Sequence, residues 1–363
     1  MFQQPIPTLC RDGDRLLVLD QTLLPFRTER ATLSTLDDVA AAIRDMQVRG
    51  APLIGATAAF GVALALERQG ADDRSLQHAL TVLGATRPTA VNLHWALTRM
   101  DTALRPLRPA QRLAAAWAEA EAIRLDDAQT CDAIGRHGLD ILRALAATRT
   151  RPLRIMTHCN AGWLATCGAG TALAPIYAAQ AAGLAVEVFV SETRPRNQGL
   201  LTAWELRAAG VAHVLIADNA AGLLLMRGEV DLVITGADRI AANGDTANKV
   251  GTYLKALAAQ AAGVPFYIAA PHSTLDFSCP DGAAIPIEDR GADEVCRLRG
   301  VTPSPGTEDD EGEIATVRLA PMDTRVANPA FDVTPAALIR GIITERGVVA
   351  AGELAALYPE RRQ

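Results

Sequence analysis

The chain has 363 residues, a length that allows two domains and a sizeable hydrophobic core. Hydrophobic residues make up 49% and charged residues 21%, as in ordinary globular proteins, and the net charge is −6. This balance argues against nucleic-acid binding, which needs a basic surface, but it leaves room for a small anionic ligand held by a few local donors.

The N-terminus has no basic segment followed by an apolar one, so we predict no secretory signal. Two uncharged stretches resemble membrane spans, but 51–66 is short, and 161–186 consists mostly of small residues interrupted by Gly and Pro. Both are predicted to be buried helices, with no membrane as a partner. The six cysteines are scattered without a CxxC pair, which is typical of a reducing, cytoplasmic location.

The first part of the chain, residues 1–145, is predicted to be a mainly helical N-terminal domain. Thr35 precedes two acidic residues and marks a helix start, and Gly50 is expected to end that helix. Pro52 then stands where the first turn of the next helix tolerates a proline. Two further helices and a short strand region are predicted over 109–124, 126–147 and 15–24.

The second part, residues 146–363, is predicted to be an α/β domain. Short apolar runs alternate with longer Ala-rich helical patterns, and the predicted strands are LRIMTH, AVEVFVS, AHVLIA, DLVITGA and PFYIAA. Strands that alternate with helices form a mostly parallel sheet with right-handed crossovers. An acidic run rich in Pro and Gly, 300–313, is predicted to be a solvated loop.

Polar residues follow each of the five predicted strands. Cys159, Glu192, Asp218, Asp238 and His272 all lie at or just beyond a strand end. Because ligands of open parallel sheets bind beyond the carboxyl ends of the strands, we predict a functional site at this edge.

Two of these residues are candidates for chemistry. Cys159 precedes a predicted helix, whose positive end would lower the pKa of the thiol; the alternative is a small buried residue. Asp238 follows a buried strand, and burial would raise the pKa of its carboxyl so that it could act as a general acid. The alternative for Asp238 is a helix cap or an ion pair with Arg239.

Cofactor motifs are not found in the sequence. The first strand of the predicted sheet is not followed by GxGxxG, and GxxxxGK[ST] does not occur. His and Cys do not cluster at the spacing of metal ligands. We therefore predict no cofactor and no metal.

Six ordered segments resemble one known family: RGAPLIGATAAFG (49–61), RPTAVNLHWAL (87–97), THCNAGWLATCGAGTAL (157–173), SETRPRNQGLLTAWEL (191–206), GADRIAANGDTANKVGTY (236–253) and APHSTLDF (270–277). This is the family that methylthioribose-1-phosphate isomerases share with the alpha, beta and delta regulatory subunits of translation initiation factor 2B. The resemblance extends through NPAFDVTPAALIRGIITERGV (328–348).

The resemblance implies a helical N-terminal domain, a Rossmann-like C-terminal domain and a homodimer. It also implies an aldose–ketose isomerase that converts 5-methylthio-α-D-ribose 1-phosphate to 5-methylthio-D-ribulose 1-phosphate in methionine salvage. Asp238 matches the family's proton donor, and Cys159 matches the residue that stabilises the transition state. The segments that match its substrate-binding positions contribute Arg49, Gly50, Ala51, Arg87, Gln198, Asn248 and Lys249. Arg and Lys suit a phosphate, and Gly and Ala let backbone N–H groups approach it.

Alternatives remain at this point. Another isomerase of the family would act on 5-deoxyribose 1-phosphate or on ribose 1,5-bisphosphate. The apolar character of 49–61 beyond its Arg favours a neutral C5 substituent over a second phosphate. A non-catalytic regulatory subunit of the initiation-factor type is the alternative from another class, and it need not keep both Cys159 and Asp238. The sequence does not choose between a hydride shift and an enolate in the isomerisation.

Overall fold

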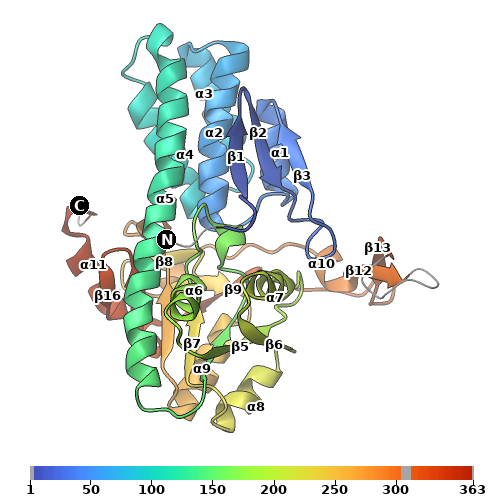
Figure 1. Ribbon diagram of the computed structural model, residues 1–363. Coiled ribbons are helices and arrows are strands. Elements are labelled where there is room, and N and C mark those ends of the chain that lie inside the picture. Colours follow the sequence, from blue (N-terminus) through green and yellow to red (C-terminus); the bar gives the residue numbers. More distant parts are fainter. Residues whose placement is uncertain (1–3, 304–311, 362–363) are drawn as a thin grey trace.

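The first part of the chain in the computed structural model, which describes residues 4–303 and 312–361, is a bundle of helices beside a small antiparallel sheet (Figure 1). The strands are β1 (Leu9–Asp12), β2 (Arg15–Leu19) and β3 (Arg30–Leu33). The helices are α1 (Leu36–Arg44), α2 (Ala51–Gln69), α3 (Asp73–Gly84), α4 (Val91–Leu104) and α5 (Pro109–Ala146).

The start of α1 is as predicted, but its end is not. Thr35 and Asp38 form a reciprocal capping box. The hydroxyl of Thr35 accepts the backbone N–H of Asp38, and the carboxylate of Asp38 accepts the backbone N–H of Thr35. The helix ends at Arg44 rather than at Gly50, which instead precedes α2. Gly50 has a φ of 94°, a conformation that suits glycine and redirects the chain into the next helix.

The helix α2 is the core helix of this part. It is long and apolar enough to cross a membrane by length and composition, and it exceeds the 51–66 stretch that looked too short in the sequence. However, 78% of its apolar window is buried inside the protein. Pro52 lies in its first turn, as predicted.

The helix α5 links two hydrophobic cores. The predicted helices 109–124 and 126–147 form this one continuous element, because no Gly or Pro interrupts the chain between them. Ile123 belongs to the core of the helical part, whereas Cys131 belongs to the core on the main sheet. Figure 1 shows α5 running along both parts. A domain division after residue 145 therefore stays a prediction.

The main sheet has the order β16-β15-β10-β7-β4-β5-β6 within the described residues. All neighbouring strands are parallel except β15 and β16. The strands are β4 (Leu153–Thr157), β5 (Val186–Ser191), β6 (Ala212–Ile216), β7 (Leu232–Thr235), β10 (Phe266–Ala269), β15 (Gly341–Thr344) and β16 (Gly347–Val349). The five predicted strands are all present, and the α/β fold class is confirmed.

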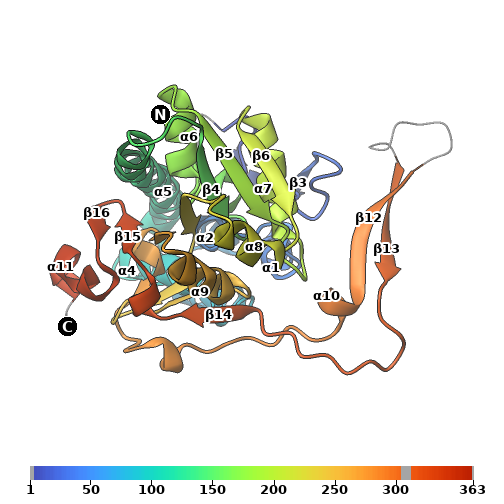
Figure 2. The ribbon, with the colours of Figure 1, turned by 90° about the horizontal axis from the view of Figure 1, so that it is seen from below.

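Helices cover both faces of this sheet (Figure 2). Ile155 packs on the side of α5 and α6, and its neighbour Met156 packs on the side of α8 and α9, as alternation along a strand requires. The helices that follow α5 along the chain are α6 (Ala174–Ala181), α7 (Gln198–Ala208), α8 (Ala220–Met226) and α9 (Thr252–Ala262).

The stretch 161–186, predicted as a buried helix, is largely irregular. It contains the 3₁₀ turn η1 (Trp163–Ala165) and the short helix α6 before β5 begins. Gly162 and Gly170 form an isolated bridge, and a Cβ on Gly170 would lie 2.4 Å from the Cα of Gly162. This close backbone crossing, which glycine alone permits, replaces the helix.

A second, smaller sheet lies beside the carboxyl edge of the main one, in the order β11-β8-β9-β14. Its strands are β8 (Arg239–Ala241), β9 (Thr246–Lys249), β11 (Leu275–Asp276) and β14 (Phe331–Thr334). The other elements are η2 (His272–Thr274), η3 (Gly282–Ala284), α10 (Asp293–Cys296), η4 (Ala336–Leu338), η5 (Ala351–Glu353), α11 (Leu354–Leu357) and η6 (Pro359–Arg361).

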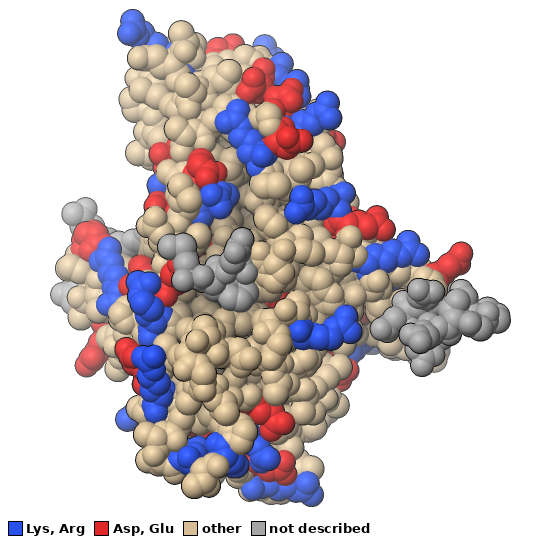
Figure 3. Space-filling model, in the orientation of Figure 1, with Lys and Arg blue, Asp and Glu red and all other residues tan. Residues whose placement is uncertain are grey.

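A hairpin of β12 (Arg297–Pro303) and β13 (Gly312–Arg318) projects from the body (Figure 2). The acidic loop predicted over 300–313 is thus partly strand, and its centre, 304–311, lies outside the described residues. On the face shown in Figure 3, basic and acidic side chains are interspersed over the helical part.

Candidate active site

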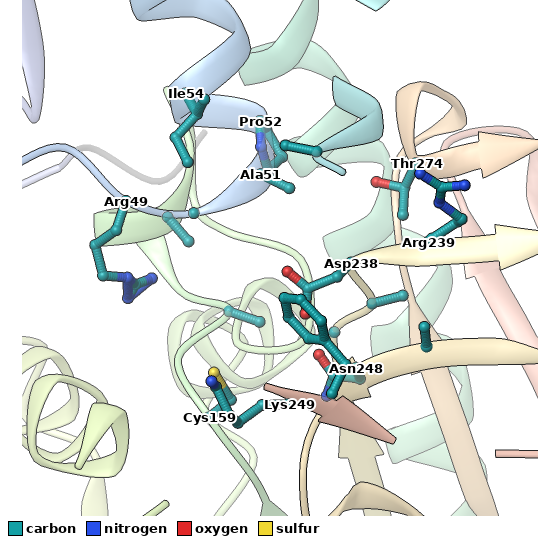
Figure 4. A pocket seen from close by; sticks show the side chains of 18 of the residues that line it. Arg49, Ala51, Pro52, Ile54, Cys159, Asp238, Arg239, Asn248, Lys249 and Thr274 are labelled. Carbon is teal, nitrogen blue, oxygen red and sulfur yellow. The ribbon is translucent and has the colours of Figure 1, made fainter. Parts of the chain in front are cut away.

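A cavity lies between the start of α2 and the carboxyl edge of the main sheet. Its lining includes all nine residues that the sequence singled out for catalysis or substrate binding, namely Arg49, Gly50, Ala51, Arg87, Cys159, Gln198, Asp238, Asn248 and Lys249. Figure 4 shows Cys159 and Asp238 on the same cavity, with Lys249 and Asn248 beside them. The candidate acid and the candidate thiol therefore share one compartment.

The wall contributed by the helical part is fixed by close packing on the main-sheet part. A Cβ on Gly50 would lie 2.3 Å from the Cα of Ala165, so only glycine fits there. This contact places Ala51 and Pro52, the first residues of α2, at the cavity. Because the first N–H groups of a helix lack partners within the helix, this end favours an anion.

Arg49 is oriented by the sheet part. Both terminal nitrogens of its guanidinium donate to Oδ1 of Asn160 at 2.6 Å, and Nη2 also donates to the Asn160 carbonyl at 3.1 Å. Asn160 in turn donates from Nδ2 to Oγ1 of Thr202 at 3.1 Å. Arg49 is thus held in one orientation across the boundary between the two cores.

Cys159 follows β4 in a left-handed conformation, with a φ of 66°. Its N–H donates to Oγ1 of Thr193 at 2.9 Å, and its carbonyl accepts a hydrogen bond from Oγ1 of Thr202 at 2.8 Å. These two hydrogen bonds stabilise a backbone conformation that is costly for a residue with a side chain.

The predicted electrostatics of Cys159 are wrong. The next α-helix, α6, begins only at Ala174, so no helix start faces the thiol directly. Burial raises the pKa of Cys159, and the positive charge of Arg49 only opposes that rise. The group is therefore suited to act as a neutral thiol.

Asp238 lies between β7 and β8, and its N–H donates to the carbonyl of Ala247 at 2.9 Å. Burial raises the pKa of its carboxyl, as predicted, although nearby cations led by Lys249 oppose this. In the described part of the chain Arg239 pairs not with Asp238 but with Asp276, at 3.2 Å, and it donates to the carbonyl of Thr89 at 2.9 Å. The ion-pair alternative for Asp238 is thereby contradicted.

Polar atoms without partners lie at the cavity. Among residues 4–303 and 312–361, neither Nζ of Lys249 nor Oε1 of Gln198 has a hydrogen-bond partner, although both atoms are buried. Burial and the positive charge of Arg290 lower the pKa of Lys249. Since buried polar groups in proteins are normally hydrogen-bonded, such atoms indicate a ligand site.

Arg290 lines the cavity and was missed by the sequence analysis. It lies between the recognised segments 270–277 and 328–348 and belongs to no motif. Other polar residues at the strand ends are structural: Asp218 accepts the N–H groups of Thr193 and Arg194 at 2.8 and 2.7 Å. Oγ of Ser273 accepts a hydrogen bond from Nδ2 of Asn92 at 2.8 Å.

Fold and cavity together define a Rossmann-like α/β protein with a cavity, lined by cationic side chains, between a helical part and the carboxyl edge of a parallel sheet. The chain matches the model of the Initiation factor 2 subunit family over residues 47–351. It belongs to this family.

Two relatives of more than 50% identity carry the same name. The chain is 59% identical over 360 residues to methylthioribose-1-phosphate isomerase of Dechloromonas aromatica, covering 98% of this chain and 97% of the relative. It is 56% identical over 356 residues to the protein of the same name from Methylorubrum extorquens, covering 97% and 95%.

Solved structures agree with the fold. The crystal structure of 5-methylthioribose 1-phosphate isomerase from Pyrococcus horikoshii OT3 has a TM-score of 0.82 and 38% identity, covering 98% of this chain and 96% of that one. The structure of translation initiation factor eIF-2B, subunit delta, from A. fulgidus has a TM-score of 0.79 and 33% identity, covering 98% and 99%.

A buried carboxyl behind the cavity leads to a prediction about pH. Glu205 is fully buried and accepts the N–H of Leu164 at 2.5 Å and the hydroxyl of Tyr177 at 3.0 Å. Burial raises the pKa of Glu205 to about 7. The folded protein therefore retains a proton that the unfolded chain releases, so this contribution to stability is present at low pH and is lost as the pH rises through about 7.

Replacing Glu205 by Gln, which resembles the protonated acid, should remove this loss. Between pH 4.5 and pH 8 the free energy of unfolding of the unmodified protein should fall by about 3 kcal/mol relative to that of Glu205→Gln. Denaturant unfolding at the two pH values measures this, with Glu353→Gln, at an exposed residue, as the control for loss of one carboxylate. The same difference between Glu205→Gln and the unmodified protein at both pH values would contradict it.

Proposed function

We propose that the protein is an aldose–ketose isomerase that converts 5-methylthio-α-D-ribose 1-phosphate to 5-methylthio-D-ribulose 1-phosphate, a step of methionine salvage. The observation that carries the proposal is the meeting of Asp238 and Cys159 in one cavity lined by cationic side chains. Support comes from relatives of more than 50% identity over nearly the whole chain that bear the isomerase name.

The substrate sets the task of the acid. Its anomeric carbon carries the phosphate, so the ring does not open to a free aldehyde. Asp238 donates a proton to the ring oxygen, and the bond between this oxygen and C1 breaks. The raised pKa of Asp238 supports this role, because a carboxylic acid must be protonated before it can donate. The phosphate remains attached to O1 throughout.

Hydrogen then moves from C2 to C1. In a hydride shift the C2 hydrogen migrates with its electron pair, and the hydroxyl on C2 gives its proton to the Asp238 carboxylate, which restores the acid and leaves a C2 carbonyl. In the enolate route the Asp238 carboxylate takes the C2 proton, which gives a C1=C2 enol that the thiol of Cys159 stabilises. The acid then returns a proton to C1 and takes the proton of the C2 hydroxyl, which again restores the acid and leaves a C2 carbonyl. Turnover in heavy water separates the routes, because label at C1 excludes a direct hydride shift.

Substrate binding is assigned to Arg49, Gly50, Ala51, Arg87, Gln198, Asn248 and Lys249. The cations attract the phosphate. The buried Nζ of Lys249 and Oε1 of Gln198, which have no partner among the residues that the structure describes, support a role in binding a polar ligand. Ile54 adds apolar surface to the same cavity, which favours a neutral C5 substituent over the second phosphate of ribose 1,5-bisphosphate. A comparison of kcat/KM for the methylthio, deoxy and bisphosphate sugars tests this selectivity.

Loss of the acid should abolish most of the turnover. General acid catalysis contributes about 10²–10⁴ in rate, so we expect Asp238→Asn to reduce kcat by that factor and to change KM only a few-fold. Phosphorus NMR measures the conversion of the anomeric phosphate to a primary phosphate ester. Asp293→Asn, at a side chain that is 83% exposed, is the control, and near-normal turnover in Asp238→Asn would exclude it as the acid.

We also propose that the protein is a cytoplasmic homodimer. Exposed apolar side chains lie on β6, α8 and α9, where Met226 is 75% and Leu254 64% exposed, and α8 packs against α9. The strand β6 is an edge of the main sheet. An apolar surface beside an open sheet edge is typical of an interface between subunits.

Charges placed on this surface should separate the subunits. The double variant Met226→Glu/Leu254→Glu is expected to be a monomer by light scattering at a concentration where the unmodified protein is a dimer. Leu125→Glu, at an exposed apolar residue of α5, is the control and should leave the mass unchanged. A double variant that keeps the dimer mass would place the interface elsewhere.

A further inference from the structure

Arg290 is held in the cavity wall by its backbone. The residue lies between η3 and α10, and its N–H donates to the carbonyl of Asn328 at 3.1 Å. The neighbouring Ala330 donates its N–H to the carbonyl of Glu288 at 2.8 Å. The segment carrying Arg290 thus runs along the residues that lead into β14, which pairs with β9 and sets Phe331 opposite Lys249.

This pairing brings two cations to one aromatic ring. The guanidinium carbon of Arg290 lies 5.3 Å from the centre of the Phe331 ring, and Nζ of Lys249 lies 5.4 Å from the same centre. The side chain of Arg290 is only 8% exposed. Both positive groups therefore lie in the same largely desolvated part of the cavity.

The positive charge there exceeds its counter-charge. Glu288 contacts Nη2 of Arg290 at 3.2 Å, but within the described residues the buried Nε of Arg290 and the buried Nζ of Lys249 have no hydrogen-bond partner. After burial, the charge of Arg290 is the largest cause that lowers the pKa of Arg87 and of Lys249. Buried like charges with unused donors are costly unless an anion joins them.

We propose that Arg290 is a substrate-binding residue that, together with Arg87 and Lys249, grips the phosphate of the sugar phosphate. This inference rests on the proposed function and deepens it by fixing the end of the cavity that receives the phosphate. Nε of Arg290, which has no hydrogen-bond partner in the described part of the chain, and the terminal nitrogens offer two parallel hydrogen bonds to phosphate oxygens, whereas a lysine offers a single point charge.

Binding of inorganic phosphate tests the proposal without turnover. We expect Arg290→Gln to weaken phosphate binding, measured by isothermal titration calorimetry, by about 10- to 100-fold, the usual effect of losing hydrogen bonds to a charged group. Arg290→Lys, which keeps the charge and loses the planar fork, should fall between Arg290→Gln and the unmodified protein. Arg297→Gln, at an arginine that is 52% exposed and paired with Asp293, is the matched control and should bind phosphate normally.

Steady-state kinetics give the second readout. Because the phosphate remains attached to O1 throughout the reaction, loss of its ligand should raise KM by a similar factor and change kcat only a few-fold. Should both Arg290 variants retain the phosphate affinity and the KM of the unmodified protein, the proposal is overturned. Phosphate binding that depends on Arg290 without conversion of methylthioribose 1-phosphate would refute the proposed reaction and leave the anion site standing.

Discussion

The contact between the Arg49–Ala51 turn and the segment after β4 is the constraint on which the site depends. Gly50 packs against the backbone of Ala165, and Arg49 donates to Asn160, so the start of α2 is fixed over the carboxyl edge of the sheet. Without this junction the helical part would contribute neither a wall nor Arg49 to the cavity, and the strand ends would form an open rim. A single close backbone approach therefore completes one wall of the cavity.

Enclosure also sets the electrostatics of the site. Burial is the largest cause of the shifted pKa values of Asp238, Cys159 and Lys249. Burial favours the neutral form of each group. Asp238 is therefore protonated more readily, and the positive charge of Lys249 is costly unless an anion lies beside it. A phosphate dianion would relieve the second effect and leave the first in place, because its negative charge raises the pKa of a nearby carboxyl further. Substrate binding would thus prepare Asp238 to donate its proton.

The sequence patterns succeeded where local rules decide the structure. Five strands were found from their apolar runs, and two of the residues at their ends, Cys159 and Asp238, do line one cavity. The patterns failed where a distant contact decides. The Gly-rich stretch after Cys159 reads as a helix, but its glycines let the chain cross itself and pack against α5. The thiol consequently lacks the helix start that was expected to lower its pKa.

The sequence by itself determined the α/β class, the strands and the nine candidate residues, because periodicity, turn residues and recognisable motifs are local properties. The tertiary structure alone decided which residues share a desolvated cavity, since burial and neighbouring charge depend on segments far apart in the chain. Arg290 carries no local signal, and only the pairing of its segment with the residues before β14 brings it to Phe331 and Lys249. Asp238 depends on local and distant sequence alike. Its position after a strand could be read from the sequence, but its burial and the cations beside it come from segments that only the fold brings together.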